Sequence, residues 1–206
     1  MISRLSDVNF CPTDLSKQNL INEKVQGECF VTGNTILDGL LPYKTFCEYS
    51  DKILVTLHRR ENHLQMDRWF EEVNALAERY REFEFILPIH PNPAVQRHRH
   101  LLTHLKIVEP LPHHDLLHIL TKSKLVISDS GGLQEEGSFF NKKIIVCRKT
   151  KERPEGIATG HLYICRSPDF LRPIFDTLIR DHRVNSRCPY GDGSAAEKIL
   201  KIIHRQ

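Results

Sequence analysis

A Ser-Gly-Gly corner between an apolar run and a helical pattern is the feature of this sequence best suited to chemistry. Residues 125–128 form the apolar run, Ser130, Gly131 and Gly132 form the corner, and the helical pattern starts at residue 133. A strand that turns into a helix through small residues exposes backbone N–H groups at the positive end of the helix, where a phosphate can approach closely. The corner therefore predicts an anion site for the diphosphate of a nucleotide. The alternative is an ordinary strand-to-helix turn whose glycines serve backbone geometry alone.

Three other polar groups also follow expected strands. They are residues 58–62 (HRREN), residues 90–93 (HPNP) and residues 148–155. Ligands of parallel sheets bind at the carboxyl ends of the strands, so these groups and the Ser-Gly-Gly corner should meet on one rim. Arginine and imidazole groups around a helix N-terminus form an electropositive crevice suited to a diphosphate. Chance placement is the alternative, and it would have to occur four times.

Strand and helix patterns alternate along the chain with short connections. This alternation predicts an α/β fold with right-handed crossovers and a Rossmann-like, doubly wound parallel sheet covered on both faces. The expected strands are residues 8–11, 28–31, 53–57, 83–89, 107–108, 125–128, 144–147 and 162–165. The expected helices are residues 13–23 (with Thr13 as N-cap), 67–80, 93–104, 114–121, 133–140, 169–181 and 194–204.

Composition limits the class of protein. The chain has 206 residues, 40% of them apolar and 27% charged, with a formal net charge of +3. Basic and acidic residues are interspersed, which argues against nucleic acid as a partner. No apolar stretch approaches the roughly 20 residues that a membrane span needs, and the N-terminus lacks the pattern of a signal peptide. We expect a globular protein of the cytoplasm without a membrane partner.

Cysteines and histidines give little support to a metal site. The six cysteines are widely spaced without a Cys-x-x-Cys pair, so we interpret them as reduced packing residues. The pairs His114/His118 and His100/His104 are spaced to share a helix face, but no carboxylate or thiol completes either pair at a usual ligand spacing. Solvated helix faces are the favoured interpretation, and we predict no metal.

Six motifs in order resemble the non-hydrolysing UDP-N-acetylglucosamine 2-epimerases, which are two-lobed enzymes of the GT-B glycosyltransferase-like fold. The resemblance covers nearly the whole chain. The motifs are residues 31–35 (VTGNT), 55–62 (VTLHRREN), 90–93 (HPNP), 129–136 (DSGGLQEE), 152–155 (ERPE) and 189–193 (PYGDG).

The resemblance implies a role for several residues. It implies a diphosphate cradle at Ser130, Gly131 and Gly132 and a carboxylate for the ribose hydroxyls at Glu136. It places the imidazole of His58 beside UDP on the leaving-group side, and Arg153 at the nucleotide. Arg59 and His90 match positions that bind an effector in members with an allosteric site; hydrogen bonds that stabilise loops are the alternative.

Three positions depart from the family pattern. Leu116 aligns where an aromatic residue usually stacks near the uracil, and Leu111 replaces a common glutamine, so base affinity is expected to fall. Gly137 stands where alanine is usual, which costs helix stability by about 1 kcal/mol at most.

The family enzymes are nearly twice as long as this chain. By the resemblance, residues 1–28 are a remnant of the first lobe, and residues 29–206 are the UDP-binding second lobe with its C-terminal crossover helix. The implied reaction interconverts UDP-N-acetylglucosamine and UDP-N-acetylmannosamine, a precursor of cell-envelope polysaccharide, by elimination and re-addition of UDP without a cofactor. The acid and base carboxylates of the family lie in the first lobe, and nothing in residues 1–28 matches them.

Two functions from different classes follow from this half-length match. One is an epimerase component that needs a first lobe for turnover, supplied by the uncropped gene product or by a complementing polypeptide. The other is a non-catalytic UDP or UDP-sugar binding module. We also expect the strand and helix of residues 8–23 to expose an unpaired strand edge and an apolar helix face. This exposure predicts either disorder there or self-association, for example as a homo-oligomer.

Overall fold

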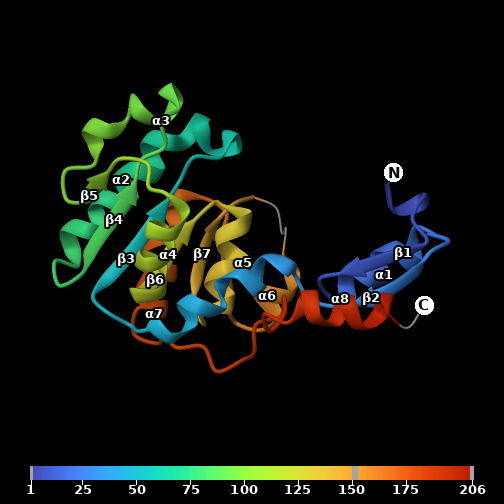
Figure 1. Ribbon diagram of the computed structural model, residues 1–206. Helices are drawn as coiled ribbons and strands as arrows, with labels where there is room; N and C mark the ends of the chain where they lie inside the picture. Colours follow the sequence, from blue (N-terminus) through green and yellow to red (C-terminus); the bar gives the residue numbers. More distant parts are fainter. Residues whose placement is uncertain (1, 150–152, 205–206) are drawn as a thin grey trace.

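The computed structural model describes residues 2–149 and 153–204 and is built around a six-stranded parallel sheet (Figure 1). The strand order is β5-β4-β3-β6-β7-β8, so the order reverses between β3 and β6. The predicted doubly wound parallel sheet is confirmed. Its strands are β3 (Lys52–Thr56), β4 (Glu84–Pro88), β5 (Lys106–Val108), β6 (Ser123–Ser128), β7 (Ile144–Cys147) and β8 (Leu162–Cys165).

Helices cover both faces of this sheet because successive strand residues point to opposite sides. On β3, Ile53 and Val55 join the cluster beneath α2 (Met66–Arg79), whereas Leu54 joins the cluster on the other face. Side chains of α7 (Leu171–Leu178) also pack in the first cluster. The second cluster contains side chains of α4 (His113–Lys122), α5 (Gly131–Phe139) and the 3-10 segment η2 (Thr35–Phe46).

Two expected helices are shorter than predicted. Residues 93–104 form only α3 (Pro93–Gln96) and the 3-10 turn η4 (Arg99–Leu101), because positions 98 and 99 carry no apolar residue to continue the buried stripe begun by Val95. Residues 169–181 become η5 (Pro168–Phe170) followed by α7. Pro173 has no N–H to donate to the carbonyl of residue 169, so the α-helix does not extend back to that residue.

Several short elements were not predicted. They are η1 (Ile2–Arg4), η2, η3 (Arg60–Gln65) and α6 (Pro154–Ala158). Strand and helix periods do not reveal η2 because Gly39 and Pro42 interrupt its pattern, although Leu37 and Leu40 are buried in the core. The other three are each six residues or fewer, too short for a hydrophobic period to be read.

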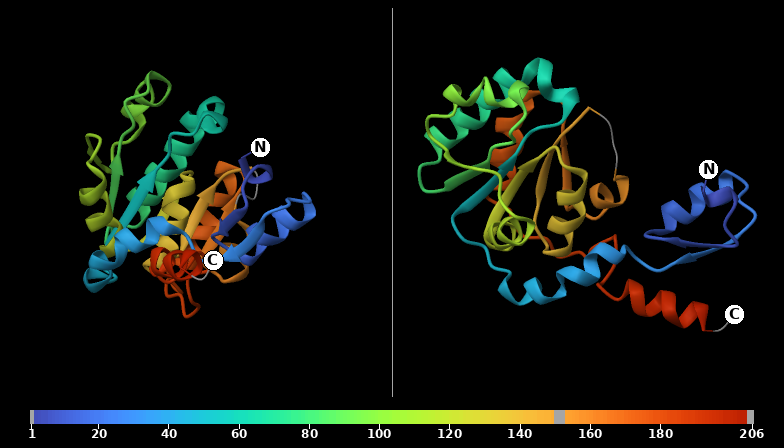
Figure 2. Two further views of the ribbon diagram at one scale, coloured as in Figure 1. Left: turned by 45° about the vertical axis from the view of Figure 1, so that its right-hand side comes forward. Right: turned by 45° about the horizontal axis from the view of Figure 1, so that its top comes forward.

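A small second unit lies beside the main sheet. β1 (Val8–Cys11) and β2 (Glu28–Val31) pair in parallel, and α1 (Asp14–Asn22) connects them. The N-cap of α1 is Thr13, as predicted. The expected boundary between the two lobes, after residue 28, thus falls inside β2, just after its first residue. All four residues of β2 pair with β1, so β2 belongs to the small unit. Figures 1 and 2 show this unit apart from the main sheet, with α8 (Ala195–Ile203) extending toward the same side.

The small unit and α8 leave apolar side chains uncovered. No residue of α1 is buried, and Ile21 is 51% exposed. Leu200 and Ile203 of α8 are 56% and 53% exposed, while Ala195 is buried. The exposed apolar helix face expected for this region is confirmed. Among the described residues, no helix is both long enough and apolar enough to cross a membrane.

Glycines join the two units where the VTGNT and PYGDG motifs meet. The N–H of Asn34 donates to the carbonyl of Tyr190 at 2.8 Å. Gly33 has φ +91°, and a Cβ there would lie 3.3 Å from Cα of Gly191, which itself has φ +132°. Both positions therefore require glycine, for backbone conformation and for close approach.

Because His161 is buried, we expect the fold to lose stability at acidic pH. Its side chain is fully buried, Nδ1 lies 2.8 Å from Oγ1 of Thr159, and burial lowers the pKa of the imidazole to about 4. An unfolded histidine binds its proton near pH 6.5, so acid favours the unfolded state as the pH falls from about 6.5 to 4. The free energy of unfolding should drop by up to about 3 kcal/mol over that window on account of this residue.

Urea denaturation at several pH values measures this loss. His161→Leu should flatten the stability profile between pH 6.5 and 4, because leucine does not titrate and the Thr159 hydroxyl keeps its contacts with the carbonyls of Glu155 and Gly156. The matched control His100→Leu changes an exposed histidine and should show the same dependence of stability on pH as the wild type. An unchanged slope in His161→Leu would contradict the prediction.

Candidate functional site

The point where the strand order reverses carries a pocket of about 270 Å³ at the carboxyl ends of β3, β4 and β6. Open parallel sheets bind ligands in the crevice at such a reversal. We call this cavity the switch-point pocket. Its lining consists of Thr56, His58, Pro88, Ile89, His90, Pro91, Pro110, Leu111, His113, Leu116, Ser130, Gly132, Leu133 and Glu136.

The amino end of α5 forms one wall of this pocket. Ser130 occupies the N-cap position, and its side chain makes no capping hydrogen bond to the helix; its own N–H donates to Oγ of Ser128 at 3.0 Å. The first turn of a helix leaves N–H groups without intrahelical partners, and α5 has no acidic residue in that turn. The wall therefore presents donors and a positive dipole end to the pocket.

Asp129 fixes the loop after β3 to the loop after β6. Its buried carboxylate accepts hydrogen bonds from the N–H of His58 at 3.0 Å, the N–H of Arg59 at 2.8 Å and Nδ2 of Asn62 at 3.0 Å. Asn62 also donates to the carbonyl of Cys147 at the end of β7. One carboxylate thus positions the start of the HRREN motif against the Ser-Gly-Gly corner.

His58 is one of the residues that line the switch-point pocket. Its ring stacks on that of His90 with centroids 5.1 Å apart, and Nδ1 lies 3.6 Å from Oδ1 of Asp129. Burial is the largest influence on the His58 pKa and lowers it, while Asp129 opposes this shift by raising the pKa. The ring is therefore neutral near pH 7, with Asp129 too distant for a hydrogen bond but close enough to orient it.

Six of the nine predicted site residues meet in the switch-point pocket. These six are His58, His90, Leu116, Ser130, Gly132 and Glu136. Gly131 is buried at the first position of α5. Arg59 lines a neighbouring pocket of about 440 Å³ with His58, Arg60, Glu61 and Arg148, where Nε of Arg148 donates to Glu61 at 2.6 Å.

Arg153 does not line the switch-point pocket. Its Nη2 lies 2.9 Å from Oε1 of Glu135, whose other oxygen accepts a hydrogen bond from Asn34 at 2.7 Å. Burial raises the pKa of Glu135, and Arg153 is the strongest influence that lowers it again. The structure therefore places this arginine on an ion pair beside the joint of the two units. Residues 150–152 of the predicted rim loop, including Glu152 of the ERPE motif, lie outside the described residues.

His113 is a pocket residue that the sequence reasoning did not single out. Its Nε2 lies 2.9 Å from Oε1 of Glu136. The loop after β5 was not counted among the polar groups of the rim, although it too follows a strand at the same edge of the sheet. Applying the same rule to that loop would have found His113.

The histidine pairs considered for a metal have other neighbours. The ring of His118 packs edge-on against Tyr43 and Phe46, and His114 lies 3.2 Å from Asp115. His100 and His104 do not share an α-helix, because residues 97–104 leave that conformation after Gln96.

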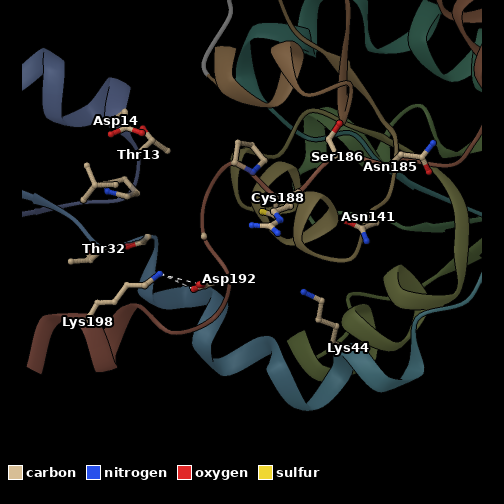
Figure 3. Close-up of a pocket in the computed structure, with 16 residues that line it drawn as sticks. Thr13, Asp14, Thr32, Lys44, Asn141, Asn185, Ser186, Cys188, Asp192 and Lys198 are labelled. Carbon is tan, nitrogen blue, oxygen red and sulfur yellow. Dashed lines mark hydrogen bonds and ion pairs between the residues drawn. The ribbon is translucent and has the colours of Figure 1, made fainter. Parts of the chain in front are cut away.

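A larger pocket of about 630 Å³ lies between the small unit and the main body (Figure 3). Thr13 enters it from the small unit and caps α1 by accepting from the N–H of Ser16. Lys198 of α8 pairs with Asp192 at 3.0 Å, and Nζ of Lys44 lies over the Phe139 ring. Its charges are of both signs, and three of them are engaged in the Lys198–Asp192 ion pair and the Lys44–Phe139 contact. The switch-point pocket lies where the strand order reverses and is the better candidate for a ligand site.

Known proteins share this arrangement over the whole chain. A family model described as UDP-N-acetylglucosamine 2-epimerase matches residues 1–204. A UDP-N-acetylglucosamine 2-epimerase of Neisseria meningitidis serogroup A is 32% identical, over 98% of this chain and 62% of that protein.

Two solved structures are also similar. The crystal structure of UDP-GlcNAc 2-epimerase from Neisseria meningitidis bound to UDP-GlcNAc matches with a TM-score of 0.88 and 31% identity, covering 99% of this chain and 63% of that one. The Staphylococcus aureus MnaA–UDP structure matches with a TM-score of 0.87 and 30% identity, covering 98% and 61%. This chain therefore spans about three fifths of the length of the relatives that it matches.

Proposed function

Because this chain belongs to the UDP-N-acetylglucosamine 2-epimerase family, we propose that it binds the UDP part of UDP-N-acetylglucosamine in the switch-point pocket. In that role it contributes to the interconversion of this sugar nucleotide with UDP-N-acetylmannosamine. The similar proteins named for UDP-GlcNAc and UDP complexes support the choice of ligand.

The observation that carries the proposal is the position of the pocket residues along α5. Gly132 and Glu136 both line the pocket and are four residues apart on one helix, roughly 6 Å along its axis. A nucleoside diphosphate laid along the helix would place its phosphates at the Ser130–Gly132 turn and its ribose near Glu136. Leu116 would then border the base, and His58 would face the bond between the diphosphate and the sugar.

The second lobe of such an enzyme assists departure of UDP. Helix N–H groups and the imidazole of His58 would stabilise the negative charge that develops on the diphosphate, an effect worth several kcal/mol of barrier in enzymes. By the resemblance, removal and return of the C2 proton belong to carboxylates of the first lobe. We propose that turnover requires that lobe, from the same polypeptide or from a complementing one, and that residues 1–28 are the portion of it present in this sequence.

A non-catalytic UDP-binding module is the second candidate. The described residues that line the switch-point pocket include one carboxylate, Glu136, and that group is bonded to His113. The pocket thus offers binding groups without a second carboxylate for proton transfer. Adding a separately expressed first lobe separates the candidates, because conversion of UDP-N-acetylglucosamine supports the epimerase and persistent inactivity with retained binding supports the module.

Calorimetric titration with UDP tests the proposal. We expect wild-type protein to bind UDP and UDP-N-acetylglucosamine, and Glu136→Gln to weaken UDP binding by about tenfold, because a neutral amide accepts a ribose hydroxyl less strongly than a carboxylate. The control Glu78→Gln alters an exposed glutamate on α2 and should bind normally. Absence of UDP binding by the folded wild type would refute the proposed function.

A further inference from the structure

We propose that His113 is a positioning residue that sets the selectivity of the pocket for a ribose diol, by holding the Glu136 carboxylate in the orientation that a hydroxyl needs. The inference rests on the proposed function, because it assigns the ribose to Glu136. It concerns a residue with no role in that proposal.

The geometry of the pair limits what Glu136 can do. The Glu136 side chain is only 7% exposed, and its Oε1 accepts from Nε2 of His113 at 2.9 Å. Among the described residues, His113 is the side chain that hydrogen-bonds to this carboxylate. One oxygen is therefore occupied, and the other is left to accept from a ligand.

The imidazole comes from a different element than the carboxylate. His113 is the first residue of α4, which follows the loop after β5, whereas Glu136 lies in the second turn of α5. Both residues line the pocket, and the His113 side chain is 56% exposed. The ring thus stands at the outer edge of the pocket and fixes the carboxylate from the solvent side.

Fixing one carboxylate oxygen favours binding of a hydroxyl to the other. A glutamate without this contact would rotate among orientations and would have to be ordered when the ligand binds, which lowers affinity. A site built to bond a hydroxyl discriminates against an analogue that lacks it, because its buried acceptor is then left without a partner. His113 should consequently affect the diol more than the phosphates or the base.

Calorimetry with UDP and 2′,3′-dideoxyuridine 5′-diphosphate tests this inference. We expect wild-type protein to prefer UDP, and His113→Ala to lower the ratio of the two affinities by about tenfold with little change in binding of the dideoxy analogue. His113→Gln, which retains an N–H donor, should restore most of the ratio. His114→Ala is the matched control, since this neighbouring histidine is similarly exposed and does not line the pocket.

If the wild type does not bind UDP, the proposed function fails and the inference falls with it. If the wild type binds UDP but His113→Ala keeps the wild-type ratio, or if the wild type binds both nucleotides equally, the inference alone is overturned. Thermal melting checks that each variant is folded. A loss of affinity for both nucleotides by the same factor indicates a purely structural role and also overturns it.

Discussion

Replacing Asp129 with alanine is expected to destabilise this protein by about 3–5 kcal/mol, the largest effect of any single substitution that we predict. The change leaves the N–H groups of His58 and Arg59 and the amide of Asn62 without their acceptor. Asn62 is 4% exposed, so water cannot readily replace the lost oxygen. A buried donor without a partner costs about 1–3 kcal/mol, and a typical domain is stable by only about 5–15 kcal/mol.

Urea denaturation measures the loss, and UDP titration of the folded fraction should show weakened binding, because His58 no longer has a fixed position. The matched control is Asp169→Ala, which removes a carboxylate paired with Arg68 at an exposed site. Exposed ion pairs contribute about 0–1 kcal/mol, so this variant should differ little from the wild type. If Asp129→Ala unfolds at the control's denaturant midpoint, the role assigned to the carboxylate is wrong.

Replacing Gly132 with alanine is expected to weaken UDP binding while leaving the fold as stable as the wild type or slightly more stable. A Cβ built at Gly132 meets no heavy atom within 4 Å, so alanine fits there and should stabilise the helix by about 0.5–1 kcal/mol. Side-chain bonds in a helix tilt toward its N-terminus, where the diphosphate is proposed to bind. The methyl group should hold the phosphates away from the helix N–H groups and weaken UDP binding by about 10–100-fold.

The control is Gly39→Ala in η2, where an added Cβ likewise meets nothing within 4 Å. Gly39 does not line the switch-point pocket, so this variant should bind UDP as the wild type does. Calorimetric titration and thermal melting of both variants give the comparison. Wild-type affinity in Gly132→Ala would show that the phosphates do not approach this turn, whereas a large loss of stability would show that the glycine is structural.

Local sequence patterns were sufficient to predict the sheet and the edge that carries the switch-point pocket. Apolar runs of strand length alternating with amphipathic helices determine a parallel α/β fold, because each element must bury one apolar face. Polar residues directly after those runs then fall on one edge of the sheet. That reasoning brought His58, His90 and Ser130 to a single pocket, as the structure has them. Glu136, which lines the same pocket, was assigned through the family resemblance.

In the small unit, local sequence patterns identified the strands but not their pairing. Residues 8–11 and 28–31 were recognised as strands, but the period of a strand does not say which neighbour it pairs with. The tertiary structure pairs β1 with β2 and keeps both apart from the six-stranded sheet. The short 3-10 and helical elements also escaped the prediction, since they contain too few residues for a period to be read.

Partners of individual side chains were decided only by the tertiary structure. Asn34 and Glu135 are about a hundred residues apart in sequence, yet they bond directly, and Arg153 joins the same carboxylate rather than the predicted pocket. His113 reaches Glu136 because α4 and α5 lie side by side on one face of the sheet. The sequence by itself determined which residue types stand at the edge of the sheet, because this depends on strand periodicity. Which of them touch depends on how helices pack across the sheet, and that geometry has no local signature in the chain.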